Sequence, residues 1–278
     1  MSATEPVPGQ AREEAPPGAP RPPLVPGHAG PIHALVLGAS RGVGHAIAAQ
    51  LAHDPRVERL YVTARQGAAS APMAELQRAQ PAKVQALACD ITVEANLAAL
   101  RIEIAARSPR LHLAINAAGL LHAPGLAPEK TVRQVTLENL RRSFAVNAFG
   151  PILLARELLP LLVHDAPAVF ASLSARVGSI GDNRLGGWYA YRAAKAAQNQ
   201  LLHSFAIELA RLNRRSIVLM LHPGTVDTAL SRPFSANVAP ERLFTAGFAA
   251  SRLLDVIGGR SAQDSGGFYA WDGQPIPW

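Results

Sequence analysis

The stretch IHALVLGASRGVG, residues 32–44, decides the fold class. Its first six residues are apolar except for His33, and such a nearly continuous apolar run is typical of a strand buried on both faces. Three glycines, Gly38, Gly42 and Gly44, then lead into a segment with helical spacing, RGVGHAIAAQLAH (41–53). Such glycines let the backbone approach a pyrophosphate, whose charge is stabilised by the free N–H groups at the helix start. The stretch therefore predicts a strand, turn and helix that bind a dinucleotide.

The same alternation of short apolar runs and helical segments continues along the chain. Strands are predicted in LYVTA, KVQALA, LHLAIN, PAVFASL and SIVLML, and helices over 94–107, 136–163 and 189–212. Strands that are buried on both faces and joined by helices form parallel sheets. The sequence therefore predicts a doubly wound α/β fold with a parallel, Rossmann-type sheet, in a single domain over residues 31–278.

Residues 1–30 differ from the rest in composition. They are rich in Pro, Gly and Ala and hold few large apolar side chains, so we expect a disordered tail without a targeting signal. Apolar runs elsewhere fall short of the roughly 20 residues that cross a bilayer, which predicts a soluble protein with no membrane partner. The single cysteine, Cys89, allows no internal disulfide and favours a cytoplasmic location.

The net charge of +7 could suggest nucleic acid, but the basic residues are scattered singly rather than grouped with aromatic residues. We therefore predict no nucleic-acid partner and a small-molecule substrate instead. The nine histidines show no metal-ligand spacing, so no metal is predicted.

The residues around the second strand indicate which dinucleotide is bound. A preference for NAD goes with an acid at the strand's end that binds the ribose 2′-hydroxyl, whereas a 2′-phosphate calls for arginine. The strand LYVTA is followed by Arg65, and Arg41 lies inside the glycine turn. Glu58 precedes the strand and so lies at its far end. These positions favour NADP(H) over NAD(H), although either arginine could simply face water.

The segment YRAAK places Tyr191 and Lys195 four residues apart, on one face of the predicted helix 189–212. A tyrosine hydroxyl, with an ordinary pKa of about 10, exchanges protons poorly near neutral pH, and a nearby ammonium lowers that pKa. The pair is therefore a candidate acid/base site. Tyr189 lacks a lysine four residues later and is expected to line the pocket with Trp188.

Together these motifs resemble those of the short-chain dehydrogenase/reductase superfamily. The resemblance rests on GASRGVG, NAAG at 116–119, Asn147 in FAVNAFGP, YRAAK and PGTVDT at 223–228, and it covers nearly everything from residue 31 onward. The segment ARVGSIGDNRLGGWYAYRAAK and the ending FYAWDGQPIPW are similar to the C-factor and sniffer-like carbonyl reductase branch. The resemblance implies reduction of a carbonyl compound by hydride from a nicotinamide cofactor.

The resemblance also implies roles for the matching positions. Tyr191 would protonate the carbonyl oxygen, and Lys195 would lower the tyrosine pKa and hold the nicotinamide ribose. Asn147 would hold a water in a proton relay, unless it bonds within a helix kink. Asp90 would contact the adenine, unless it caps a turn, and Asn116 would steady the sheet. The remaining cofactor-binding positions are Gly38, Ser40, Arg41, Gly42, Val43, Gly44, Arg65, Ile91, Ala117, Ala118, Gly119, Pro223, Gly224, Val226 and Thr228.

Two positions depart from the family pattern. Leu37 stands where the glycine motif often has Thr, which removes a local hydrogen bond. In SLSARVGS, Ala175 aligns with the serine that hydrogen-bonds the substrate oxygen. Ser174 could replace that serine only where the backbone is irregular, because a one-residue shift turns a side chain to the other face of a strand. Ser179 and the absence of any serine are the alternatives.

We therefore expect an NADPH-dependent reductase of apolar aldehydes or ketones, with a pocket formed by 120–130, 178–190 and the segment after Thr228. A nucleotide-binding signalling or interaction protein with weak or lost catalysis is the alternative, and Ala175 motivates it. The two long predicted helices commonly build dimer faces in the superfamily, so a homodimer or homotetramer is compatible with the sequence.

Overall fold

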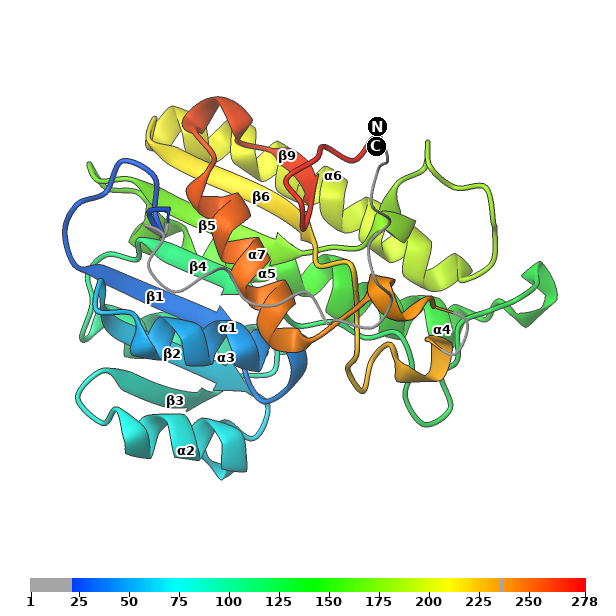
Figure 1. The fold of residues 1–278 in the computed structure, drawn as a ribbon, viewed down its shortest axis with the longest axis horizontal. Helices are drawn as coiled ribbons and strands as arrows, with labels where there is room; N and C mark the ends of the chain where they lie inside the picture. Colours follow the sequence, from blue (N-terminus) through cyan, green and yellow to red (C-terminus); the bar gives the residue numbers. More distant parts are fainter. Residues whose placement is uncertain (1–21, 236–237) are drawn as a thin grey trace, which may run out of the picture.

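The computed structural model describes residues 22–235 and 238–278. At its centre lies a seven-stranded parallel sheet in the order β3-β2-β1-β4-β5-β6-β9 (Figure 1). The predicted doubly wound α/β fold in a single domain is confirmed. The strands are β1 (Ile32–Leu37), β2 (Val57–Ala64), β3 (Val84–Ala88), β4 (Leu113–Asn116), β5 (Ala168–Leu173), β6 (Ser216–His222) and β9 (Gly267–Ala270).

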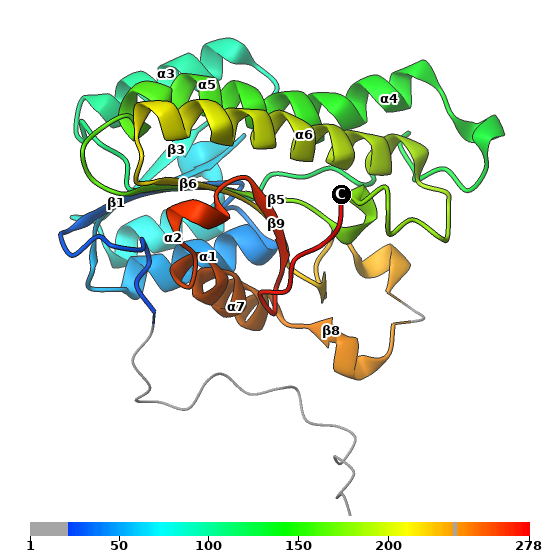
Figure 2. The same ribbon diagram turned by 90° about the horizontal axis from the view of Figure 1, so that it is seen from above.

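Helices cover both faces of this sheet, as Figure 2 shows. On one face lie α1 (Gly42–His53), α2 (Ala71–Ala79) and α7 (Ala246–Gly258). On the other lie α3 (Glu94–Ala105), α4 (Leu137–Phe144), α5 (Gly150–Leu162) and α6 (Tyr189–Leu212). A separate pair of short strands, β7 (Thr225–Val226) and β8 (Leu243–Phe244), follows β6. The short helices are η1 (Gly67–Ala69), η2 (Val132–Gln134), η4 (Arg176–Gly178), η5 (Arg232–Phe234), η6 (Pro240–Arg242) and η7 (Ala262–Asp264).

The two faces of the sheet bury separate apolar clusters, which explains the continuous apolar strands. In β1, Val36 belongs to the cluster that contains Leu253 of α7, whereas Leu35 belongs to the cluster that contains Leu202 of α6. Because side chains alternate between faces along a strand, a strand buried on both faces needs an apolar residue at every position.

The helical run Leu137–Leu162 contains α4, the π-helical turn η3 (Ala145–Phe149) and α5. Within the described part of the chain it is the single helix long and apolar enough to cross a membrane. Half of its most apolar stretch of 18 residues is buried inside the protein. The run packs against α3 and α6. Because the core helix of a soluble protein meets the same criterion, this helix is weak evidence for a membrane span.

The expected N-terminal tail divides into two parts. Residues 1–21 lie outside the described residues, but residues 22–30 pack on the domain. Leu24 and Val25 are buried, and the Arg56 guanidinium donates a hydrogen bond to the Pro22 carbonyl at 2.9 Å. Burying an aliphatic side chain contributes about 1.5–3 kcal/mol. The folded part therefore begins by residue 22 rather than at residue 31, because two apolar residues outweigh the Pro-rich composition around them.

Candidate active site

The chemistry-bearing residues gather at the edge of the sheet where the parallel strands end. Gly38 follows β1, Arg65 follows β2, Asn116 ends β4 and Pro223 follows β6. The strand order reverses between β1 and β4. At such a reversal a doubly wound sheet opens the crevice in which it binds its ligand.

The glycine turn in this crevice has no room for side chains. Gly38 and Gly42 have φ angles of 88° and 57°, a region that favours glycine. A Cβ atom on Gly38 would lie 2.8 Å from the Ala118 nitrogen, and one on Gly42 would lie 3.2 Å from Thr228 Cγ2. The turn therefore brings together three predicted cofactor-binding segments. The N-cap residue Arg41 makes no side-chain cap, so the first N–H groups of α1 can bind an anion.

Arg41 and Arg65 are both exposed at this edge. Neither takes part in any ion pair of residues 22–235 and 238–278. Glu58 lies near the start of β2, with its carboxylate 3.6 Å from His33 Nε2, and so lies at the far end of the strand. Two guanidinium groups are thus free to bind a phosphate beside the glycine turn.

Asp90 and Asn116 both hold turns at the crevice. One Asp90 carboxylate oxygen accepts hydrogen bonds from the Thr92 N–H and hydroxyl, at 2.9 and 2.7 Å. Asn116 donates to the Ser172 hydroxyl at 2.9 Å and accepts from the Ala118 N–H at 3.1 Å. These bonds connect β4, β5 and the NAAG turn, while the turn made by Asp90 leaves its second carboxylate oxygen for a ligand.

Asn147 is buried in the π-helical turn η3. Its side chain accepts a hydrogen bond from the Leu120 N–H at 3.0 Å and donates one to the Leu120 carbonyl at 2.7 Å. The second amide hydrogen points to the Ser143 hydroxyl at 3.3 Å. The side chain thus ties the irregular helix to the loop after β4. Any water held by Asn147 has to bind the backbone or the remaining lone pair of Oδ1.

Tyr191 and Lys195 lie one turn apart in α6, and both are buried. The Lys195 Nζ lies 5.9 Å from the centre of the Tyr191 ring. Burial raises the pKa of Tyr191 and lowers the pKa of Lys195 to about 7. In the chain alone the pKa of Tyr191 is therefore raised, where we expected a nearby ammonium to lower it, because burial disfavours the phenolate. The phenol stays protonated near neutral pH, which is the form that a general acid needs.

The start of α6 is fixed by Glu129, a buried residue that the sequence does not single out. Its carboxylate accepts a hydrogen bond from the Ala190 N–H at 3.2 Å, and its backbone carbonyl accepts one from Trp188. Trp188 has a φ of 52° and is the sole non-glycine residue with positive φ among the described residues. Such backbone strain costs on the order of 1–3 kcal/mol and clusters at functional sites. The centroid of the Trp188 ring lies 6.3 Å from that of the Tyr191 ring and 5.1 Å from that of the Phe234 ring.

The serines near Ala175 are hydrogen-bonded to other groups of the protein. Ser174 is buried, and its hydroxyl donates to Asn199 Oδ1 at 2.7 Å. Because Asn199 lies two turns after Tyr191, about 12 Å along the helix axis, this bond does not bring Ser174 to Tyr191. Ser179 is buried as well, and its hydroxyl accepts a hydrogen bond from the Asp182 N–H at 3.1 Å.

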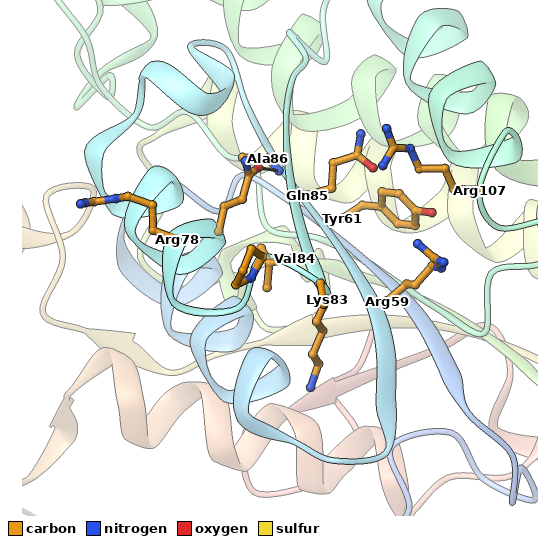
Figure 3. Close-up of a pocket in the computed structure, with 11 residues that line it drawn as sticks. Arg59, Tyr61, Arg78, Lys83, Val84, Gln85, Ala86 and Arg107 are labelled. Carbon is orange, nitrogen blue, oxygen red and sulfur yellow. Dashed lines mark hydrogen bonds between the residues drawn. The ribbon is translucent and has the colours of Figure 1, made fainter.

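A surface cavity lies outside the edge of the sheet where these residues gather. It has a volume of about 400 Å³ and lies beside the edge strand β3 (Figure 3). Figure 3 shows Arg59 and Arg107 on either side of the Tyr61 ring, while Arg78 points away from them. None of the predicted site residues lines this cavity. The crevice at the strand ends is therefore the better candidate for chemistry.

The histidines that lie close together do not form a metal site. His112 packs against His28, His33 and His164, with ring centroids 4.3, 5.7 and 5.4 Å away. Burial and these neighbours lower the pKa of His112 to about 4. Across residues 22–235 and 238–278, no three His, Cys, Asp or Glu side chains are arranged to hold a metal ion.

Comparisons with known proteins agree with this geometry. A family model described as short chain dehydrogenase matches residues 32–239. The 1-hydroxy-2-glutathionyl-2-methyl-3-butene dehydrogenase of Rhodococcus sp. (strain AD45) is 30% identical over 247 residues, which are 88% of this chain and 98% of that protein. C-signal of Myxococcus xanthus is 33% identical over 144 residues, 52% of this chain and 81% of that protein.

Solved structures show the same similarity. The NADPH-bound carbonyl reductase from chicken fatty liver has a TM-score of 0.79 and 25% identity, over 90% of this chain and 100% of that one. The carbonyl reductase Sniffer of D. melanogaster has a TM-score of 0.78 and 24% identity, over 89% of this chain and 100% of that one. The Sniffer match supports the fold alone.

Proposed function

The chain belongs to the short-chain dehydrogenase family and is an oxidoreductase, and on this basis we propose that it reduces an apolar aldehyde or ketone with NADPH. The observation that carries the proposal is the buried pair of Tyr191 and Lys195 on one face of α6, with the lysine hydrogen-bonded to the Leu173 carbonyl at the carboxyl end of β5. Members of the family use nicotinamide cofactors, and the chicken relative binds NADPH.

The residues of the crevice fit such a cofactor. A Cβ atom on Gly44 would lie 2.9 Å from the Ala117 side chain, so the start of α1 packs directly against the NAAG segment and only glycine fits there. In dinucleotide-binding folds this close packing accompanies a glycine turn whose backbone approaches the pyrophosphate. Arg41 and Arg65 would bind the 2′-phosphate that distinguishes NADPH from NADH. Bound NADPH would supply the hydride for the reduction.

The protein's own part in the reaction is proton transfer and orientation. The Tyr191 phenol would give its proton to the carbonyl oxygen, and the Lys195 ammonium would stabilise the phenolate that remains. Trp188 and Phe234 form an aromatic wall beside this hydroxyl, and Leu230 lies near Gly119. This wall favours an apolar substrate and limits the access of water.

The proposal is tested by following NADPH oxidation with purified protein and a panel of apolar aldehydes, ketones and quinones, with NADH in parallel. Turnover with NADPH is the expected result. Protein that binds NADPH but turns over no substrate would favour the alternative, a nucleotide-binding protein with weak or lost catalysis. The observation that favours this alternative is the alanine at position 175, together with the hydrogen bond that the Ser174 hydroxyl donates to Asn199.

The cofactor preference makes a separate prediction. Replacing both Arg41 and Arg65 by alanine is expected to raise the KM for NADPH about 10- to 100-fold and to leave the KM for NADH unchanged, because charge-assisted hydrogen bonds contribute about 1.5–3 kcal/mol. Steady-state kinetics with both cofactors measures this. Arg78→Ala, which removes an exposed arginine of α2, is the matched control. Equal effects on NADPH and NADH would show that the arginines do not bind the 2′-phosphate.

Position 175 makes another prediction. Ala175→Ser is expected to raise kcat/KM by about 10²-fold, because one hydrogen bond to a developing oxyanion contributes on the order of 10²- to 10³-fold. Ala175→Val adds bulk without a hydroxyl and is expected to bring no gain. An unchanged rate in the serine variant would mean that another donor already binds the substrate oxygen.

The finer expectations on cellular context stay predictions. They are a cytoplasmic location, a homodimer or homotetramer, and the absence of nucleic-acid and membrane partners. Gel filtration of the full chain would test the oligomeric state directly.

A further inference from the structure

We propose that Gln198 is a positioning residue of the active site, whose side-chain amide holds the Lys195 ammonium and links it to the NAAG turn. The proposal rests on the proposed function, because it assumes that the charge of Lys195 matters for the reaction. Gln198 does not touch the substrate or the cofactor in this proposal and acts through the lysine.

The contacts of the ammonium carry the proposal. Lys195 is 2% exposed, and its Nζ donates to the Leu173 carbonyl at 2.8 Å and to Gln198 Oε1 at 2.8 Å. An ammonium has three N–H donors and accepts nothing. Two donors are therefore directed into the protein, and one is left for a hydroxyl group of the nicotinamide ribose.

The nitrogen of the Gln198 side-chain amide is also hydrogen-bonded within the protein. Gln198 is 0% exposed, and its Nε2 donates to the Ser172 hydroxyl at 3.1 Å and to the Leu173 carbonyl at 3.2 Å. Ser172 also accepts from Asn116, whose Oδ1 accepts from the N–H of Ala118. Because the lysine can only donate, the amide oxygen must face it, which fixes the orientation of the amide. A chain of hydrogen bonds thus runs from Lys195 to the NAAG turn.

The surroundings explain why the ammonium needs this amide. Burial lowers the pKa of Lys195 to about 7, and burial is the sole cause of that shift. Each buried acceptor favours the charged lysine, and Gln198 supplies one of the two. The ionisable side chains on the elements packed against α6, and elsewhere on α6 itself, are Glu138, Arg141, Arg142, Arg156, Glu157, Arg176, His222, Tyr189, Tyr191, Arg192, His203, Glu208 and Arg211. Among the described residues none of these forms a salt bridge or hydrogen bond with the ammonium.

The lysine content of the chain makes a direct test practical. Lys83, Lys130 and Lys195 are the three lysines of the sequence. Protein labelled with ¹³C at the lysine ε-carbon therefore gives three NMR signals, which Lys83→Arg and Lys130→Arg variants assign. The pH titration of the Lys195 signal then reports its charge without any turnover.

Two variants of similar length should move that titration in opposite directions. Gln198→Met removes the acceptor, and the Lys195 midpoint is expected about one pH unit lower than in the wild type. Gln198→Glu replaces the amide by a carboxylate, and the midpoint is expected about one pH unit or more higher. In the active enzyme, the alkaline limb of the kcat profile is expected to move in the same two directions.

The controls separate positioning from a structural role. Asn199→Leu also removes a buried amide from α6, but that amide accepts from Ser174 and not from Lys195. It is expected to lower stability and leave the Lys195 midpoint unchanged. Midpoints that stay unchanged in both Gln198 variants, or that move the same way in both, would overturn the proposal. If the methionine variant does not fold, the glutamate variant decides, because a carboxylate that takes the place of the amide beside the ammonium raises the midpoint, whereas one that points elsewhere leaves it near the wild-type value.

The outcomes also distinguish this proposal from the proposed function. A wild type without carbonyl reduction, combined with opposite midpoint shifts, would refute the function and leave the contact between Gln198 and Lys195 established. A wild type that reduces carbonyls, combined with unchanged midpoints, would refute the positioning role alone.

Discussion

Tyr191→Phe is expected to lower kcat about 10²- to 10⁴-fold, the range that a positioned general acid contributes. The variant keeps the ring and loses only the hydroxyl. Burial raises the pKa of this phenol. Among the described residues the Tyr191 hydroxyl makes no hydrogen bond that the substitution would remove. We therefore expect a folded variant that binds NADPH as the wild type does.

Single-turnover kinetics, together with NADPH fluorescence titration, measures the two effects separately. Tyr189→Phe is the matched control, because Tyr189 lies two residues earlier in α6 and is 41% exposed. Tyr189→Phe is expected to retain the wild-type kcat, because a pocket-lining tyrosine contributes to substrate binding and not to proton transfer. A Tyr191→Phe variant with full activity would mean that the carbonyl oxygen takes its proton from water or another group.

Much of the crevice is predictable from sequence because its residues follow strands that are recognisable locally. Continuous apolar runs mark the strands, and a parallel sheet brings their carboxyl ends to one edge. Gly38, Asn116 and Pro223 lie far apart in the sequence, yet each directly follows or ends such a run. The edge of the sheet is therefore fixed by local patterns together with one topological rule.

The supporting residues are not predictable in this way. Gln198 is the first of three consecutive amide residues on a helix, and the sequence gives no sign of which of these amides is buried or which group it meets. Glu129 binds the start of α6 from about 60 residues away, and no spacing rule connects the two positions. The partner of the Ser174 hydroxyl likewise depends on the backbone conformation directly after β5 ends at Leu173. Such long-range contacts are set by packing, not by local composition.

Lys195→Met is expected to show how much the buried Lys195 ammonium lowers the free energy of unfolding. Burial lowers the pKa of Lys195 from 10.5 to about 7 in the folded protein. Between these two values the unfolded chain binds more protons than the folded one, so raising the pH stabilises the wild type. Below about pH 7 the lysine is protonated in both the folded and the unfolded chain, so burying its charge lowers the stability of the folded protein by the full amount. We expect the difference in unfolding free energy between wild type and Lys195→Met to change by about 4 kcal/mol between pH 7 and 10, in favour of the wild type.

Urea unfolding of both proteins across this pH range measures the change. The variant also leaves Gln198 Oε1 and the Leu173 carbonyl without their donor, which lowers its stability. This loss is the same at every pH, so it cancels when the change of stability with pH is compared. Lys130→Met, which removes an exposed lysine, is the matched control for the general loss of a positive charge. A difference that stays flat with pH would mean that the Lys195 ammonium is not desolvated. The lysine would then be an ordinary charged group, and the pH dependence expected for the Gln198 variants would lose its physical basis.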